Sequence, residues 1–166
     1  EEGSRTSGED QRILYVYVTS PDCDACSSED HVRLIRRSKR SLRDKFSEHP
    51  NLGFSSILVS TDSTPLRGLS TLESLGPFDE INIGNGGRNL GSSAFIWERL
   101  PSEPSIPQLS LFLVRYGGSE DRIRVQSRMT LSRMIGAREI KEWARDGFRV
   151  PLSNGSKGSA TPLSGR

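Results

Sequence analysis

The stretch "RILYVYVTSPDCDAC", residues 12–26, decides the fold of this chain. It opens with a near-continuous run of β-branched and aromatic side chains, which is typical of a strand covered on both faces. Both cysteines of the 166-residue chain, Cys23 and Cys26, follow this run and are separated only by Asp24 and Ala25. The stretch therefore predicts a central strand that leads directly into a Cys-x-x-Cys turn.

An amphipathic helix is expected after the turn, from about Cys26 to Phe46. Its apolar residues share one stripe at helical spacing, namely Val32, Ile35, Leu42 and Phe46. Seven Lys or Arg residues between Arg33 and Lys45 occupy the rest of the helix surface. Because no aromatic side chain interleaves with these cations, we interpret them as a solvated face and expect no nucleic acid as a partner.

The rest of the chain alternates between strands and helices. The expected elements are a strand at 52–62, a helix at 64–76, a short strand at 78–84, a short helix at 91–100, two strands at 106–116 and 122–129, and a helix at 136–148. The Gly-Gly pair after the first of these two strands suits a tight antiparallel connection. This order predicts an α/β fold, with a mixed sheet flanked by helices.

The composition fits one globular domain with polar ends. Apolar residues make up 33% of the chain and the mean hydropathy is -0.53, which is low for a chain that is all core. We expect a flexible N-terminal tail at 1–10, a domain at 11–152 and a disordered C-terminal tail at 153–166.

The sequence carries no run of about 18 apolar residues, which is the length a membrane-spanning helix needs. It begins at Glu1 and shows no export signal, as a mature exported protein would. We therefore expect an exported, periplasmic protein, with any membrane tether outside this sequence. A cytoplasmic location is the alternative.

The cysteine pair admits three interpretations: a redox pair, an inert disulfide or half of a metal site. Zinc prefers about four ligands, and only His31 and His49 are available to join the cysteines. Attachment of a c-type haem needs a histidine where Ser27 stands. A bridge over so short a loop removes little chain entropy. We therefore favour the redox pair, expect neither metal nor cofactor, and interpret His31 as a surface residue.

The position of the two thiols suggests their roles. Cys23 lies at the start of a helix, where unpaired backbone N–H groups favour its thiolate, so it is the expected nucleophile. Cys26, one turn further and more buried, is expected to resolve a mixed disulfide. Asp22 and Asp24 oppose the thiolate and no cation adjoins Cys23 in sequence. We expect a Cys23 pKa of about 7 to 8 and a moderately reducing pair.

At this point the sequence resembles a known family. Residues 13–26, "ILYVYVTSPDCDAC", are similar to the central strand and active-site turn of the thioredoxin-like superfamily, and residues 104–116, "PSIPQLSLFLVRY", to its cis-proline segment. The resemblance implies that Ile106-Pro107 is a cis peptide facing the cysteines. It also implies that the backbone of Ile106 pairs with an extended substrate.

The spacing of these motifs indicates which branch of the superfamily the chain resembles. Pro107 follows Cys26 by 81 positions, and the surplus over a minimal thioredoxin is a strand-helix insert from about Asp62 to Leu100. Such inserts are similar to those of the TlpA, ResA and peroxiredoxin-related branch, many of which are exported and membrane-tethered. The resemblance implies a thiol-disulfide oxidoreductase that acts on protein dithiols and disulfides and receives electrons from an upstream donor.

The sequence also departs from the family pattern. The usual Trp-Cys-Gly-Pro-Cys is replaced by Asp-Cys-Asp-Ala-Cys at 22–26, and the buried acid of many thioredoxins falls on Tyr17. The proton acceptor for Cys26 is therefore not identified, and the candidates are Asp62, Glu80 and Glu98.

Two other functions stay open at this point. Ser20 stands three residues before Cys23, which is similar to the peroxide site of peroxiredoxins, although the expected proline falls on Val16 and no activating arginine is assigned. A non-catalytic binding or assembly subunit that uses the basic helix as its contact is the other. The natural substrate, the redox direction in the cell and the oligomeric state are not predicted.

Overall fold

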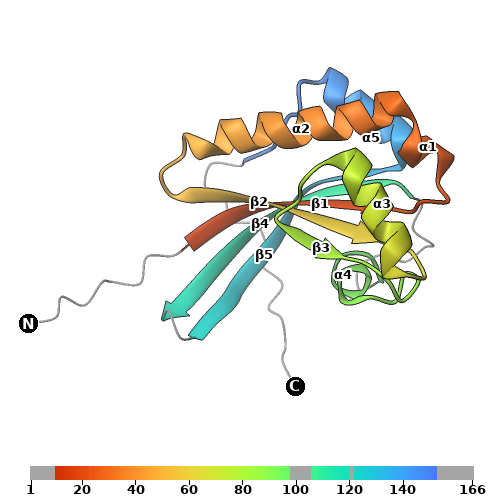
Figure 1. Ribbon diagram of the computed structural model, residues 1–166. Coiled ribbons are helices and arrows are strands. Elements are labelled where there is room, and N and C mark those ends of the chain that lie inside the picture. Colours follow the sequence, from red (N-terminus) through yellow and green to blue (C-terminus); the bar gives the residue numbers. More distant parts are fainter. Residues whose placement is uncertain (1–9, 98–105, 120–121, 153–166) are drawn as a thin grey trace, which may run out of the picture.

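The computed structural model describes residues 10–97, 106–119 and 122–152 (Figure 1). A five-stranded sheet runs through the molecule in the order β3-β2-β1-β4-β5. Its strands are β1 (Asp10–Thr19), β2 (Leu52–Ser60), β3 (Glu80–Asn82), β4 (Gln108–Ser119) and β5 (Arg122–Ile135). Its helices are α1 (Asp24–Ser27), α2 (Glu29–Ser47), α3 (Pro65–Leu75), α4 (Leu90–Ser92), the π-helical η1 (Ser93–Trp97) and α5 (Gly136–Arg145).

The sheet is mixed, as the sequence predicts. β1 runs parallel to β2, and β2 parallel to β3, whereas β4 is antiparallel to both β1 and β5. The predicted α/β class is confirmed, and the arrangement is compatible with a thioredoxin-like fold. The predicted tails lie outside the described residues except for Asp10, so the domain boundaries stay predictions.

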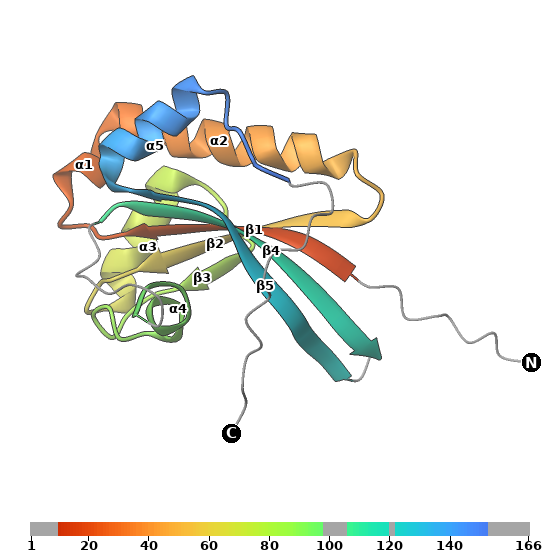
Figure 2. The same cartoon turned by 180° about the vertical axis from the view of Figure 1, so that it is seen from behind.

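β1 is the central strand, and both of its faces are buried. Alternate side chains of a strand point to opposite sides of the sheet, and residues 13–19 are all buried. One face packs under α2 and α5 in a cluster that includes Ile13, Tyr15, Tyr17, Ile35, Phe46 and Ile140. The other face packs against η1 in a second cluster that includes Leu14, Val16, Val18, Ile96 and Phe112. Figures 1 and 2 show these helices on the two sides of the sheet.

The helix expected from Cys26 to Phe46 is broken at Ser28. This residue has an extended backbone with ψ of 138°, and it separates α1 from α2. The Ser27 and Ser28 hydroxyls donate to the Asp24 and Ala25 carbonyls at 3.1 and 3.3 Å. Such local side-chain bonds compete with helical ones, which explains why two adjacent serines interrupt the expected helix.

The insert between β2 and β4 contains α3, β3, α4 and η1. Its predicted end, Glu98 to Leu100, lies outside the described residues. Within α3, Leu75 is buried, whereas Leu66 is 79% exposed. Nine residues of an α-helix correspond to a rotation of about 180° from a multiple of full turns, so these leucines occupy opposite sides of the helix.

Lys39 departs from the expected solvated face of α2, because it is only 7% exposed. Its ammonium group donates to the Leu75 and Pro77 carbonyls at 3.4 and 2.5 Å and lies 3.5 Å from the centre of the Phe78 ring. Burial lowers the pKa of Lys39 to about 8. The side chain therefore fastens α2 to the end of α3.

Asp79 joins α2, β2 and the start of β3. Its Oδ2 accepts from the Ser56 N–H and hydroxyl at 2.7 and 2.8 Å and from the Arg43 guanidinium at 2.7 Å. Partial burial raises the pKa of Asp79, but these hydrogen bonds and the Arg43 charge outweigh it and hold the pKa below its usual value.

We predict that Asp79→Asn lowers the free energy of unfolding by about 1 to 2 kcal/mol at neutral pH, because charge-assisted hydrogen bonds are lost at a partly exposed site. The contribution is fully present above the ordinary pKa of 3.8 and is lost as the pH falls through the lower folded-state pKa. Urea denaturation at several pH values measures it. Asp44→Asn, on the exposed side of α2, is the control and should leave stability nearly unchanged.

Candidate functional site

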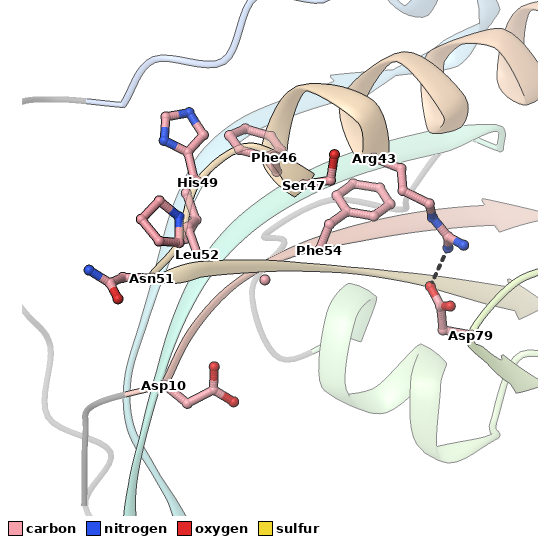
Figure 3. A pocket seen from close by; sticks show the side chains of 11 residues that line it. Asp10, Arg43, Phe46, Ser47, His49, Asn51, Leu52, Phe54 and Asp79 are labelled. Atoms are coloured by element: carbon pink, nitrogen blue, oxygen red, sulfur yellow. Dashed lines mark hydrogen bonds and ion pairs between the residues drawn. The ribbon is translucent and has the colours of Figure 1, made fainter.

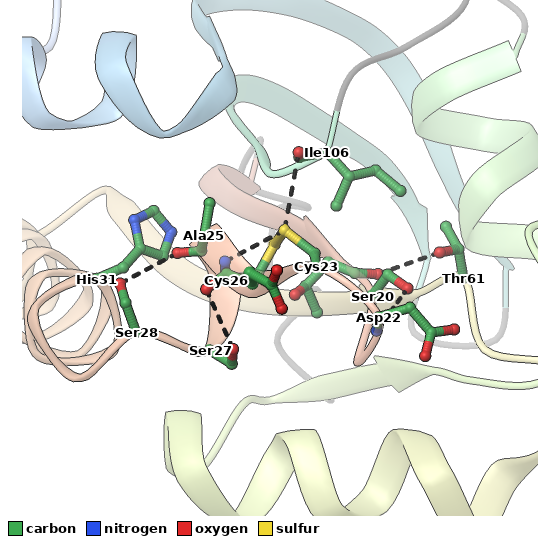
Figure 4. The surroundings of a disulfide bond; sticks show 12 residues. Ser20, Asp22, Cys23, Ala25, Cys26, Ser27, Ser28, His31, Thr61 and Ile106 are labelled. Carbon is green, nitrogen blue, oxygen red and sulfur yellow. Dashed lines mark hydrogen bonds between the residues drawn. A yellow bond between two sulfur atoms is a disulfide. The ribbon is translucent and has the colours of Figure 1, made fainter.

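A disulfide between Cys23 and Cys26 lies where β1 gives way to α1 (Figure 4). Cys23 is the N-cap of α1 and is half-buried, whereas Cys26 is 4% exposed. The two sulfurs therefore differ in access. Cys23 is the one that a large partner reaches first, and Cys26 lies behind it.

Backbone groups of the turn surround the Cys23 sulfur. The Cys26 N–H donates toward Cys23 Sγ at 3.2 Å and also to the Cys23 carbonyl at 2.9 Å. An N–H aimed at a sulfur stabilises a thiolate there and lowers its pKa. The geometry of the turn therefore favours Cys23 as the ionised thiol once the disulfide is reduced.

The chain brings Ile106 and Pro107 to the cysteines. The Ile106 carbonyl oxygen lies 3.8 Å from Cys23 Sγ, and the Ile106-Pro107 peptide is cis. The Pro107 carbonyl is already used, since it accepts from the Gly136 N–H at 2.7 Å. Ile106 is half-buried, and its carbonyl comes from a segment that is remote in sequence from the cysteine turn.

An arginine that is remote in sequence reaches the cysteine turn. Arg67 of α3 forms an ion pair with Asp22, the residue just before Cys23. No cation adjoins Cys23 in sequence, but the fold brings Arg67 to Asp22, so the charge of Asp22 is partly offset. The Arg67 and Asp22 side chains are 50% and 72% exposed, so the influence of this ion pair on the Cys23 thiol is modest.

His31 is fully buried, so the prediction of a surface residue is wrong. Its Nε2 lies 3.0 Å from the Tyr17 hydroxyl, which is buried in turn. Burial lowers the pKa of His31, and the nearby Lys141 charge lowers it further. The signal was available: His31 falls four residues before Ile35, on the apolar stripe of α2.

The three acids considered as proton acceptors are placed differently. Asp62 is 3% exposed and accepts a hydrogen bond from the Ser60 hydroxyl through Oδ2. Glu80 is exposed on the edge strand β3, in a hollow that Tyr116 also lines. Glu98 lies outside the described residues. Of the three, only Asp62 is a buried carboxylate in the described part of the chain.

The described cavities are lined by other residues. One of about 580 Å³ lies at the end of α2 and the start of β2, with His49, Phe54 and Asp79 in its wall (Figure 3). Two others, of about 420 and 360 Å³, lie beside the end of α3 and against the η1 face of the sheet. Neither cysteine lines any of these three cavities.

The described residues contain neither a metal-binding cluster of side chains nor a helix that could span a membrane. No group of three or more His, Cys, Asp or Glu side chains in residues 10–97, 106–119 and 122–152 is arranged to hold a metal ion. No helix in the same residues has the length and apolar character needed to cross a membrane.

Ser20 carries the hydroxyl of the peroxiredoxin-like spacing. This hydroxyl accepts a hydrogen bond from the Asp22 N–H at 3.2 Å.

No protein-family model matches this chain, and comparison with the curated proteins finds no match.

We predict that Arg67→Gln raises the pKa of the reduced Cys23 thiol by less than about one unit, because Asp22 then carries an unpaired charge beside it. The ultraviolet absorbance of the thiolate, followed against pH, measures this value. Arg138→Gln, which removes an exposed arginine of α5, is the control. An unchanged pKa in Arg67→Gln would show that the ion pair does not act on the thiol.

We also predict that the oxidised protein loses stability as the pH falls below the ordinary histidine pKa of 6.5, because His31 is buried with a lowered pKa. A buried histidine with a lowered pKa contributes fully to the free energy of unfolding above its pKa in the unfolded chain. This contribution is lost as the pH falls toward its lower pKa in the folded protein. Urea unfolding against pH measures the loss. His31→Gln should flatten this dependence, whereas His49→Gln, at an exposed site, should retain it.

Proposed function

We propose that this protein is a thiol-disulfide oxidoreductase of the thioredoxin-like superfamily, similar to the TlpA and ResA type. The observation that carries the proposal is the Cys23–Cys26 disulfide, with one accessible and one buried sulfur. The Ile106 carbonyl beside Cys23 Sγ supports it, because a substrate disulfide that approaches this sulfur meets that backbone.

The proposed reaction begins with the reduced pair. The Cys23 thiolate attacks one sulfur of a substrate disulfide, a Cys23–substrate bond forms, and the other substrate sulfur leaves as a thiolate. Cys26 then attacks Cys23 Sγ, closing the Cys23–Cys26 disulfide and releasing the second substrate thiolate. Two electrons pass to the substrate, and an upstream dithiol donor restores the reduced pair.

The substrate is proposed to be a protein and not a small molecule. Cys23 is half-buried and its sulfur lies 3.8 Å from the Ile106 carbonyl oxygen, so an extended backbone segment of a partner can reach both. In this proposal the Ile106 backbone pairs with an extended segment of the substrate, and Pro107 positions that backbone beside Cys23. The residues assigned are Cys23 as attacking thiol, Cys26 as resolving thiol, and Ile106 and Pro107 as substrate-binding.

We propose a reducing or exchanging role, in an exported and periplasmic setting. The Cys26 N–H favours the Cys23 thiolate, and Arg67 offsets the opposing charge of Asp22. The exposed Asp24 disfavours the thiolate. This balance favours a moderately acidic thiol. Cell fractionation of the full-length protein tests the location, and recovery in the cytoplasm would contradict it.

We predict that Cys23→Ser abolishes the reduction of disulfide-bonded insulin, because the attacking thiol is gone. Cys26→Ser should abolish turnover as well but accumulate a mixed disulfide at Cys23, visible as a mass increase that dithiothreitol removes. Ser27→Ala is the control beside the pair. Equal trapping by both cysteine variants would contradict the assigned roles.

The equilibrium reduction potential tests the direction of the reaction. Free thiols are trapped after incubation in graded glutathione or dithiothreitol buffers. A potential below about -220 mV supports a reductant, whereas one near -120 mV indicates an oxidant. A pair that cannot be reduced under mild conditions would favour the non-catalytic binding subunit.

A further inference from the structure

We propose that the buried imidazole of His31 accepts the proton that Cys26 gives up in the resolving step, with Tyr17 holding the ring. This inference rests on the thiol-disulfide exchange proposed above. It assigns the proton acceptor to a residue on α2, and not to one of the acids Asp62, Glu80 and Glu98.

The position of His31 is the first argument. The ring lies among the residues that surround the disulfide (Figure 4). The ring is fully buried, and Cys26 is only 4% exposed. A proton leaving Cys26 has little access to solvent there, so a buried acceptor shortens its path.

The hydrogen bonding of the ring is the second argument. Nε2 is occupied by the Tyr17 hydroxyl at 3.0 Å, whereas Nδ1 is buried and has no hydrogen-bond partner among the described residues. A buried polar atom without a partner costs free energy and calls for an explanation. When Nε2–H donates to the Tyr17 oxygen, Nδ1 keeps a lone pair that accepts a proton.

The charges facing the ring are the third argument. It faces Tyr17 on β1, Lys141 on α5 and the cysteine turn. In the oxidised protein the disulfide is neutral, so burial and Lys141 both keep His31 uncharged. A thiolate at Cys26 reverses this balance, because an opposite charge nearby favours the imidazolium.

The proton and electrons balance through the step. The Cys26 S–H bond breaks, the proton moves to His31 Nδ1, and the sulfur keeps the electron pair. This thiolate attacks Cys23 Sγ and breaks the Cys23–substrate bond, whose electron pair leaves on the substrate sulfur. The imidazolium gives its proton to that thiolate or to water, and His31 returns to its neutral form.

The chain offers a clean test because it contains just two histidines, His31 and His49. Proton NMR titration of the unmodified protein follows both rings in the disulfide and dithiol forms. We expect the His31 pKa to be higher in the dithiol form. Equal His31 values in the two forms would overturn the inference, and this measurement needs no variant that has to fold.

Kinetics with oxidised glutathione give a second readout. His31→Gln is expected to slow closure of the Cys23–Cys26 disulfide about 10- to 100-fold at neutral pH, with less loss at higher pH, while attack by Cys23 is unaffected. Tyr17→Phe should show a smaller loss, and His49→Gln none. A loss that is equal in both steps, or one produced by Asp62→Asn instead, would overturn the assignment.

Exchange with glutathione distinguishes a wrong function from a wrong role of His31. If the unmodified protein does not exchange with glutathione at all, the proposed oxidoreductase function is wrong. If it exchanges normally but His31→Gln closes the disulfide with the same pH profile, the function stands and only the role of His31 is wrong.

Discussion

The burial of β1 on both faces is the constraint on which the rest of the structure depends. A strand paired with β2 on one edge and β4 on the other has no free edge, and residues 13–19 leave it no exposed face. Its end is therefore fixed, and the cysteine turn begins from a rigid point. Because β4 begins at Gln108, directly after Pro107, its pairing with β1 brings Ile106 to the sulfur.

Two tyrosines on β1 set how α2 lies over the sheet. The Tyr15 hydroxyl bonds to Ser38 at 2.8 Å, and the Tyr17 hydroxyl to His31 at 3.0 Å. Buried hydrogen bonds between two elements penalise any slip of one past the other, because each slip leaves polar groups unpaired. The helix that carries the cations is thus fixed against the strand that leads into the cysteine turn. The buried residues of β1 thus hold α2 in place and also position the cysteine turn.

The sequence predicted what periodicity and local motifs encode. The apolar run of β1, the Cys-x-x-Cys turn and the order of strands and helices follow from hydrophobic patterning, and the structure confirms them. Contacts between distant segments were not readable: the approach of Arg67 to Asp22 and the hydrogen bond between His31 and Tyr17 depend on tertiary packing. The break at Ser28 was missed because two serines are compatible with a helix until their hydroxyls find local carbonyls.

The contact between α3 and the cysteine turn has a consequence for how such a domain diversifies. Arg67 stands 45 residues beyond its partner Asp22, inside the insert and outside the segments that resemble a minimal thioredoxin. Sequence change in the insert therefore reaches the cysteines while the motif itself stays constant. Substitutions in α3 can therefore change the reactivity of the Cys23 thiol in small steps, without any change in the cysteines or in the sheet.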